Sequence, residues 1–350
     1  MSLNDFDALL LLSFGGPEGE DEVIPFLENV TRGRGIPRER LKEVGEHYFH
    51  FGGVSPITEQ NRRIISNLEH ELAEREIDLP VYFGNRNWHP FGEDAVKQMA
   101  ANGHRRVLVF ATSAWGGYSA CRQYDEDVVR LRKVAPEMEF TKLWQFYAHP
   151  EFIRLNAEYL KEAVAKADMS RTKVLFSAHS VPTAADNASG GPEDANLYSR
   201  QVAESSRLIA QAAGIDDYEV VWQSRSGNPA TPWLEPDVVD RSLEIGAEDN
   251  VTHIICVPVG FITDHMEVIW DLDTELKDGI AEKGMTLDRL PTVGLTSDFA
   301  AMVVDIAENV AQDTEPVSLS TVTVQGCTVN GAACAVECCA PQRPAVAHSS

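Results

Sequence analysis

The chain has 350 residues, the length of about two domains of ordinary size. Hydrophobic residues make up 43% of it and charged residues 24%, as in globular proteins with a sizeable core. The formal net charge of -24 argues against nucleic-acid binding and against docking on anionic membranes, because both partners require a basic surface.

The first apolar run begins close to the N-terminus, in MSLNDFDALLLLSFGGPEG. Asp5 and Asp7 stand where a secretory signal would carry lysine or arginine, so we interpret residues 8–14 as a first buried strand. No stretch approaches the roughly 20 apolar residues of a membrane span. The expected compartment is therefore the cytoplasm.

Short apolar runs alternate with longer amphipathic segments along most of the chain. The expected strands read DALLLLSF, LPVYFGN, RVLVFAT, KVLFSA, YEVVWQS, THIICVPVGF and PTVGLTS. Helical patterns such as SPITEQNRRIISNLEHELAERE lie between them. Continuous apolar strands separated by helices predict parallel sheets covered on both faces. We predict an α/β fold of two similar, doubly wound, Rossmann-like lobes, residues 1–160 and 161–315, with a cleft between them.

The composition changes after these lobes, where helical periodicity is lost. Residues 316–350 are predicted to form a cysteine-rich tail whose final stretch, APQRPAVAHSS, is disordered. Four of the six cysteines lie in this tail, namely Cys327, Cys334, Cys338 and Cys339. Structural disulfides are not expected in the cytoplasm, so these thiols require another explanation.

Ligands of doubly wound folds bind at the carboxyl ends of strands, so the residues there matter most. His179 ends a strand in FSAHSVP. A histidine at such a place is more often structural than functional. Beside a carboxylate, however, its neutral nitrogen would bind a metal or accept a proton near physiological pH.

The segment GFITDHMEVIWDLDTELKDG supplies such carboxylates. At 100° per residue, one narrow arc of a helix would contain Asp264, Glu267, Asp271, Glu275 and Asp278. Like charges four residues apart cost roughly 0.2–0.5 kcal/mol per pair, and no basic residue interrupts the stripe. The plain interpretation is an acidic helix start favoured by the helix dipole. The functional interpretation is a carboxylate ladder that leads cations or protons to a cleft.

Three further segments suggest ligand contacts. TRGRGIPRER, with Arg32 and Arg34, is either a basic surface loop or a site that grips carboxylates bidentately. Ser55 precedes Pro56 as an expected helix N-cap, and its hydroxyl serves either that cap alone or also a ligand. The aromatic residues of SAWGGYSACRQYDED, Tyr124 among them, suit either a planar ligand or an ordinary core. Nucleotide-binding, hydrolase and zincin signatures are absent.

Together these motifs resemble the ferrochelatase family, whose members insert iron into a porphyrin in haem synthesis. The resemblance rests on LLLSFGGPE, GGVSPIT, SAHSVP and PVGFITDHMEVIWDLDTE, and it covers roughly residues 7–312. The combination of the last two motifs at this separation is specific, whereas either motif alone would not be. The family fold, two Rossmann-like lobes with a porphyrin cleft between them, agrees with the fold predicted above.

The resemblance also implies roles for individual residues. His179 and Glu267 match the pair that contacts ferrous iron, with His179 as proton acceptor and Glu267 facing it across the gap that holds the porphyrin. Asp271 and Glu275 would relay iron or protons. The implied porphyrin contacts are Ser55, Tyr124, Phe14 and, for the propionates, Arg32 and Arg34.

The implied substrate is coproporphyrin III, because SFGGPE and the cysteine-bearing tail look most like bacterial enzymes that use it. Four propionates would give the arginines a clear purpose. Some of these enzymes have a tyrosine ligand to the product iron where this chain has Phe14, which cannot bind iron. The alternatives are a protoporphyrin IX ferrochelatase and a non-catalytic porphyrin or haem carrier. Transient contacts with neighbouring haem-pathway enzymes are also implied.

The tail resembles the iron–sulfur-binding extension of some ferrochelatases, in which one ligand comes from the body of the protein and the others from the terminus. The implied ligands of a [2Fe–2S] cluster are Cys121, Cys327, Cys334 and Cys339, with Cys338 as the alternate to Cys339. Zinc is the main alternative, although the spacing lacks the short CxxC motifs of most zinc sites. Cys256 lies within a predicted strand and is interpreted as structural.

Overall fold

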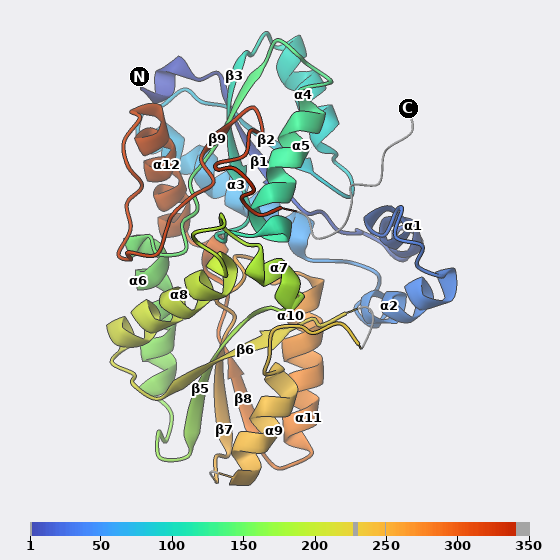
Figure 1. Cartoon of the computed structure of the whole chain (residues 1–350), viewed down its shortest axis with the longest axis vertical. Coiled ribbons are helices and arrows are strands. Elements are labelled where there is room, and N and C mark those ends of the chain that lie inside the picture. The colour runs from blue at the N-terminus through green and yellow to red at the C-terminus, as the bar shows by residue number, and fades with distance from the viewer. Residues whose placement is uncertain (1, 227–229, 249, 341–350) are drawn as a thin grey trace.

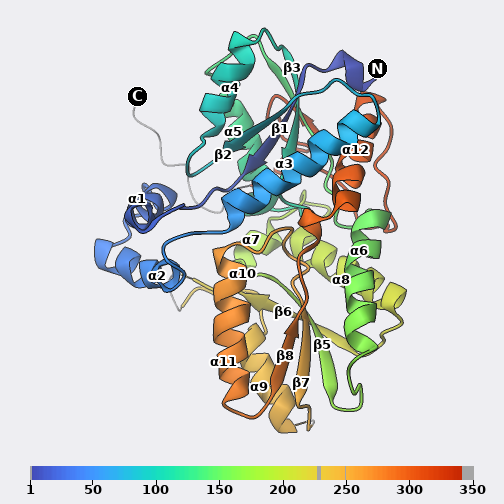
Figure 2. The same cartoon turned by 180° about the vertical axis from the view of Figure 1, so that it is seen from behind.

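The computed structural model of the chain describes residues 2–226, 230–248 and 250–340. It contains two sheets flanked by helices, one sheet in each of two lobes (Figures 1 and 2). The prediction of an α/β fold with two Rossmann-like lobes is confirmed. The predicted disorder of the chain end concerns residues 341–350, which lie outside the described residues.

The first sheet has the strand order β2-β1-β3-β4-β9. Its parallel strands are β1 (Ala8–Ser13), β2 (Val81–Asn85), β3 (Arg106–Ala111) and β4 (Glu139–Lys142). Every residue of β1 is buried, because this strand lies inside the sheet and helices cover both faces. The tail contributes β9 (Thr328–Val329), which pairs antiparallel to β4 at the edge.

The second sheet is wholly parallel, in the order β6-β5-β7-β8. Its strands are β5 (Thr172–His179), β6 (Tyr218–Gln223), β7 (His253–Val257) and β8 (Thr286–Arg289). The strand predicted for PTVGLTS is wrong, because this segment forms a short 3-10 helix, η4 (Val293–Leu295). The edge position is filled instead by β8, whose sequence TLDR is too polar to be recognised as a strand.

The helices lie between the strands, as the alternation of patterns predicted. Those that precede β4 are η1 (Leu3–Asp5), α1 (Glu20–Val30), α2 (Arg38–His50), α3 (Ile57–Glu74), α4 (Gly92–Ala101), η2 (Tyr118–Arg122) and α5 (Gln123–Leu131). Those that follow β4 are α6 (Pro150–Val164), α7 (Thr183–Asn187), α8 (Leu197–Ala213), α9 (Val238–Glu248), α10 (Met266–Trp270), η3 (Asp271–Leu276), α11 (Lys277–Ala281) and α12 (Ser297–Ala311).

The two lobes share one hydrophobic core. It includes Leu11 of β1, Phe176 of β5 and Phe299 of α12. Helix α12 returns from the second lobe to pack on α3 (Figure 2), while α6 packs on α8. The chain therefore crosses between the lobes more than once, and the division at residue 160 remains a prediction.

The described part of the tail packs along the body of the protein. The backbone N–H of Leu319 donates to the carbonyl of Ala148, and the Tyr147 hydroxyl donates to the Val322 carbonyl at 2.6 Å. Further on, β9 joins the first sheet. Within the described ranges, no helix has both the length and the apolar character required to span a membrane.

Candidate active site

His179 and Glu267 lie side by side at the carboxyl end of the second sheet. His179 is the last residue of β5, and Glu267 lies in the first turn of α10, which follows the neighbouring strand β7. The distance between His179 Nε2 and Glu267 Oε1 is 3.6 Å, and the side chains are 35% and 52% exposed. This spacing leaves no room for a flat macrocycle between them. The expectation that they face each other across such a ring is wrong, because both groups project from neighbouring strand ends of one lobe.

Backbone contacts fix the position of His179. Its Nδ1 donates to the carbonyl of Ser180, which turns Nε2 toward Glu267. The Tyr198 hydroxyl donates to the His179 carbonyl at 2.7 Å. Gly260, after β7, packs directly on β5, and a Cβ added there would lie 2.6 Å from the Cα of Ala178. The imidazole is therefore held by the junction of two strands.

The two side chains change each other's protonation. Burial lowers the pKa of His179, but the negative charge of Glu267 outweighs this effect and the pKa rises to about 9. Burial raises the pKa of Glu267, but the positive charge of His179 outweighs it and the pKa falls to about 2. At neutral pH the pair is an imidazolium and a carboxylate. A metal ion that binds Nε2 must therefore displace a proton.

The acidic segment is not one regular helix. Between α10 and α11 the chain widens into the π-helix η3. Asp264 does not belong to the stripe, because α10 begins only at Met266, after the extended N-cap His265. The Asp264 carboxylate accepts a hydrogen bond of 2.9 Å from Arg289, which also pairs with Asp273 at 2.6 Å. The predicted position of Asp264 on a ladder without basic partners is therefore wrong.

Asp271 and Glu275 remain on the same segment as Glu267. The Asp271 carboxylate accepts hydrogen bonds from Gln223 Nε2 at 3.2 Å and from the Ser224 hydroxyl. Burial raises the pKa of Asp271 to about 7, helped by the charges of Glu267 and Glu275. Glu275 accepts a hydrogen bond of 2.9 Å from Trp270 Nε1. Asp271 can thus exchange a proton near neutral pH.

The sequence pattern did not single out Gln223 and Ser224, which are the last two residues of the predicted strand YEVVWQS. Helix α2 was not singled out either, although its run GEHYFH carries four aromatic or imidazole rings. The His47 ring stacks on Trp270 with 4.0 Å between centroids, and burial together with the charge of Glu267 raises the pKa of Tyr48. Helix α2 therefore covers the acidic helix from the other lobe.

Of the expected porphyrin contacts, Phe14, Arg32 and Arg34 are exposed. Phe14 is 40% exposed, directly after β1, and its ring centroid lies 6.3 Å from that of Phe26. Arg32 and Arg34 lie in the loop between α1 and α2. All three side chains are accessible to a ligand.

Ser55 and Tyr124 are buried. Ser55 is not the helix N-cap that the sequence predicted, because α3 begins one residue later, with Pro56 at that position and no side-chain cap. The Tyr124 hydroxyl shares a hydrogen bond of 3.2 Å with Thr112, and its ring lies 4.5 Å from the Arg86 guanidinium carbon. Burial raises the pKa of the Tyr124 hydroxyl.

Four cysteines line a small pocket where the tail meets the first lobe, namely Cys121, Cys334, Cys338 and Cys339. The sulfur of Cys338 lies 3.4 Å from that of Cys334 and 3.7 Å from that of Cys339. The backbone N–H groups of Gly117 and Gly190 donate to Cys339 Sγ at 3.2 and 3.4 Å. Three of the four predicted cluster ligands, Cys121, Cys334 and Cys339, therefore line this pocket. Cys338, the alternate to Cys339, lines it as well.

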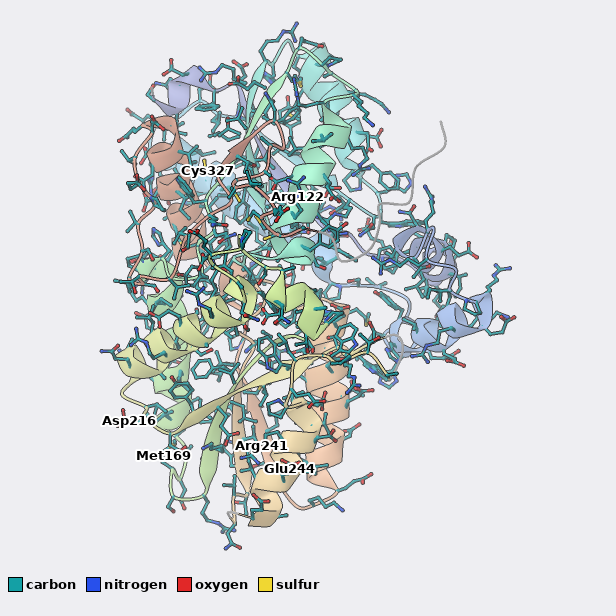
Figure 3. All side chains as sticks on the ribbon, in the orientation of Figure 1. Arg122, Met169, Asp216, Arg241, Glu244 and Cys327 are labelled. Atoms are coloured by element: carbon teal, nitrogen blue, oxygen red, sulfur yellow. The ribbon has the colours of Figure 1, made fainter. Side chains whose placement is uncertain are left out.

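Cys327 does not line this pocket. Figure 3 shows it to one side of Arg122, which does. Burial raises the pKa of the Cys327 thiol to about 11. Cys256 is fully buried in β7. Among the described residues, no group of three or more His, Cys, Asp and Glu side chains is arranged closely enough to hold a metal ion.

The ferrochelatase family model matches residues 6–311. This chain belongs to the ferrochelatase family. Its relatives include the Coproporphyrin III ferrochelatase of Corynebacterium glutamicum (strain R), with 54% identity over 341 residues, 95% of this chain and 92% of the relative. The protein of the same name from Nocardia farcinica (strain IFM 10152) is 54% identical over 350 residues, 97% of this chain and 99% of the relative.

Among solved structures, "SirB from Bacillus subtilis with Fe3+" matches with a TM-score of 0.53. The match covers 90% of this chain and 100% of that chain at 12% identity, so it bears on the fold alone. The ferrochelatase match ends at residue 311, and the tail with its four cysteines lies beyond it.

Proposed function

We propose that this chain inserts ferrous iron into coproporphyrin III to give iron coproporphyrin III, a step of haem synthesis. The observation that carries the proposal is the His179–Glu267 pair, with one imidazole nitrogen 3.6 Å from one carboxylate oxygen on partly exposed side chains. A site with two protein ligands is incomplete, whereas a structural metal site surrounds its metal with four ligands. An incomplete site suits a protein that must release the metal to a substrate. The names of the relatives supply the substrate.

The reaction exchanges two pyrrole protons for one ferrous ion. His179 Nε2 and Glu267 are the proposed iron contacts, and both would approach the macrocycle from the same side. Nε2 cannot accept a proton while it coordinates iron, so it would take one pyrrole proton only once the iron has passed to the nitrogens of the macrocycle. Asp271, whose pKa is about 7, is the proposed next proton acceptor, and Glu275 leads toward solvent.

The proposed porphyrin contacts divide by exposure. Phe14 would touch the macrocycle, while Arg32 and Arg34 would pair with propionates through charge-assisted hydrogen bonds. Ser55 and Tyr124 are buried, so they would act as the walls behind the ligand. The cytoplasm and transient contacts with neighbouring haem-pathway enzymes are the setting that this function implies.

Turnover with two porphyrins tests the substrate. Purified protein is given ferrous iron anaerobically with either coproporphyrin III or protoporphyrin IX, and metalloporphyrin formation is followed by absorbance. We expect kcat/KM to favour coproporphyrin by about tenfold or more, since each lost charge-assisted hydrogen bond costs ~1.5–3 kcal/mol. Equal turnover would contradict the proposed substrate, and binding without turnover would favour the carrier.

The charge coupling of the pair has its own test. In Glu267→Gln, the pKa of His179 should fall from about 9 toward its ordinary value of about 6.5, because the attracting carboxylate is gone. NMR titration of the imidazole in metal-free protein measures this shift. Glu275→Gln removes a carboxylate that does not face the imidazole and should leave the pKa unchanged. An unaltered titration in the first variant would refute the coupling.

We also propose that the tail cysteines bind a [2Fe–2S] cluster. The support is the pocket lined by four thiols, the donor type that such clusters require, with backbone N–H groups directed at one sulfur. The proposed ligands are Cys121, Cys334, Cys338 and Cys339, with Cys327 as the alternative that the resemblance implied. When bound, the cluster would supply one-electron chemistry, and iron insertion itself transfers no electron.

Serine variants discriminate between the ligand sets. After anaerobic reconstitution, Cys121→Ser and Cys334→Ser should lose the visible absorption and the iron and sulfide content of the wild type. Cys338→Ser should lose them too, whereas Cys327→Ser should retain them, because its sulfur is outside the pocket. If Cys338→Ser retained the cluster and Cys327→Ser lost it, the fourth ligand would be Cys327 instead of Cys338.

A further inference from the structure

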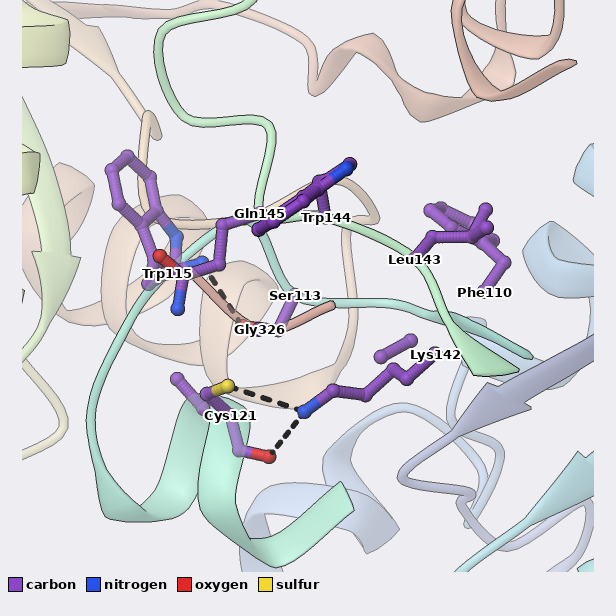
Figure 4. Close-up of a pocket in the computed structure, with 11 residues that line it drawn as sticks. Phe110, Ser113, Trp115, Cys121, Lys142, Leu143, Trp144, Gln145 and Gly326 are labelled. Carbon is purple, nitrogen blue, oxygen red and sulfur yellow. Dashed lines mark hydrogen bonds between the residues drawn. The ribbon is translucent and has the colours of Figure 1, made fainter. Parts of the chain in front are cut away.

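Lys142 is a buried cation beside the cysteine pocket. It is the last residue of β4, and its side chain is 3% exposed. Its ammonium donates hydrogen bonds to Cys121 Sγ at 3.2 Å and to the Cys121 carbonyl at 3.1 Å (Figure 4). Burying an ammonium is costly unless it is paired and hydrogen-bonded, so this arrangement requires compensation.

The compensating charge connects Lys142 to the tail. Asp125 Oδ1 lies 2.7 Å from Lys142 Nζ, and the Asp125 side chain is 2% exposed. The same oxygen accepts a hydrogen bond of 2.6 Å from the Thr328 hydroxyl. Thr328 belongs to β9 and is the register partner of Lys142 across the β4–β9 pair. This ion pair therefore links three parts of the chain. They are β4, the η2–α5 segment that carries both Cys121 and Asp125, and the tail strand β9.

The space around this contact is small. A cavity of about 10 Å³ is lined by Cys121, Lys142, Gln145 and Gly326, and it holds about one water at most. In Figure 4 the ammonium and the sulfur point toward each other with no side chain between them. The closing tail residue Gly326 disfavours a side chain, because its φ is +93° and an added Cβ would lie 3.3 Å from Cys121 Sγ, a tight contact. The sulfur is thus confined by the ammonium on one side and by the tail on another.

We propose that Lys142 is a positioning residue for the cysteine pocket. Its ammonium fixes Cys121 Sγ relative to the tail cysteines and places a positive charge beside that sulfur. The inference rests on the proposed cluster site and adds to it a residue outside the ligand set. A hydrogen bond and a positive charge at a ligand sulfur stabilise the reduced cluster, so they raise its reduction potential.

The test uses the full chain in two states. In the metal-free state, Cd²⁺ alone is the probe, and its thiolate charge-transfer absorption separates the cysteine pocket from other sites. In the reconstituted state, the reduction potential is measured by chemical titration. Two variants are used. The first is Lys142→Met alone. The second combines Lys142→Met with Asp125→Asn, so that both charges are removed and no unpaired carboxylate is left to unfold the protein. Lys173→Met is the matched control, because Lys173 is also shielded and paired with carboxylates but lies in the second sheet.

We expect both Lys142 variants to weaken Cd²⁺ binding about tenfold and to lower the potential by about 59 mV, which is a tenfold change for a one-electron couple. Lys173→Met should change neither. Values equal to the wild type in both Lys142 variants would overturn the inference while leaving the cluster in place. A wild type that reconstitutes no cluster, with weaker Cd²⁺ binding in the Lys142 variants, would overturn the cluster and support the positioning role. A wild type that binds neither would overturn both.

Discussion

Replacing His179 by alanine should lower kcat for iron insertion by about 10²–10⁴-fold while coproporphyrin still binds. Once iron has displaced its proton, the imidazole is the one nitrogen donor of the pair, and after the iron has left Nε2 it is also the group placed to receive a pyrrole proton. Alanine removes both roles but leaves the exposed surfaces that would hold the macrocycle. Anaerobic turnover with ferrous iron measures kcat, and quenching of porphyrin fluorescence measures binding.

His70→Ala is the matched control for this variant. His70 is an exposed histidine on α3 that pairs with a neighbouring glutamate, so its loss should change neither turnover nor binding. Thermal unfolding of both variants checks that the fold is retained. Wild-type turnover in His179→Ala would exclude the proposed mechanism, whereas loss of porphyrin binding would show that the imidazole holds the ligand instead.

Gly260→Ala should both destabilise the protein and reduce its activity. The added methyl group would lie 2.6 Å from the Cα and 2.7 Å from the Cβ of Ala178, so the end of β5 and the turn after β7 would have to separate. Overpacking of this kind costs about 1–3 kcal/mol. Since His179 directly follows Ala178, the separation would also move Nε2 away from Glu267. Denaturant unfolding and turnover measure the two effects.

Gly191→Ala is the corresponding control, because a Cβ at Gly191 meets nothing within 4 Å. It should lie within about 0.5 kcal/mol of the wild type, as most surface substitutions do. If Gly260→Ala behaved like this control, the close packing of the two strand ends would not be what positions the imidazole.

The central strands could be predicted because their burial is continuous. The strands β1, β5 and β7 lie inside their sheets, and each contains a continuous apolar run. The strands β4 and β8 escaped prediction because they lie nearer the sheet edges and carry polar side chains in EFTK and TLDR. The reverse error occurred at PTVGLTS, whose β-branched residues pack in a turn between β8 and α12. Composition alone does not distinguish a buried turn from a strand.

The residues of the site were easier to predict than their geometry. His179 and Glu267 each lie at a strand end that the pattern of apolar runs identifies, but the 3.6 Å between them depends on how β5 and β7 pair. The π-helical turn after Trp270 leaves no trace in the spacing of the acidic residues. Helix α2 reaches the acidic helix through a contact of high sequence separation, between His47 and Trp270, which no local pattern encodes.

The tail shows the same limit. The resemblance implied Cys327 as a ligand and Cys338 as the alternate to Cys339, and a count of intervening residues says nothing of the path of the chain between these thiols. In the structure, Thr328 enters the first sheet beside β4, and further along the chain Cys338 and Cys339 line one pocket with Cys121. The sheet pairing, rather than the spacing, decides which thiols meet.

Anomalous diffraction from crystals soaked anaerobically with Co²⁺, a stand-in for ferrous iron, tests the central claim most directly. The account predicts a metal ion within bonding distance of both His179 Nε2 and a Glu267 carboxylate oxygen, on one side of any bound porphyrin. A metal ion that contacts neither residue, or a macrocycle lying between the two, would contradict it.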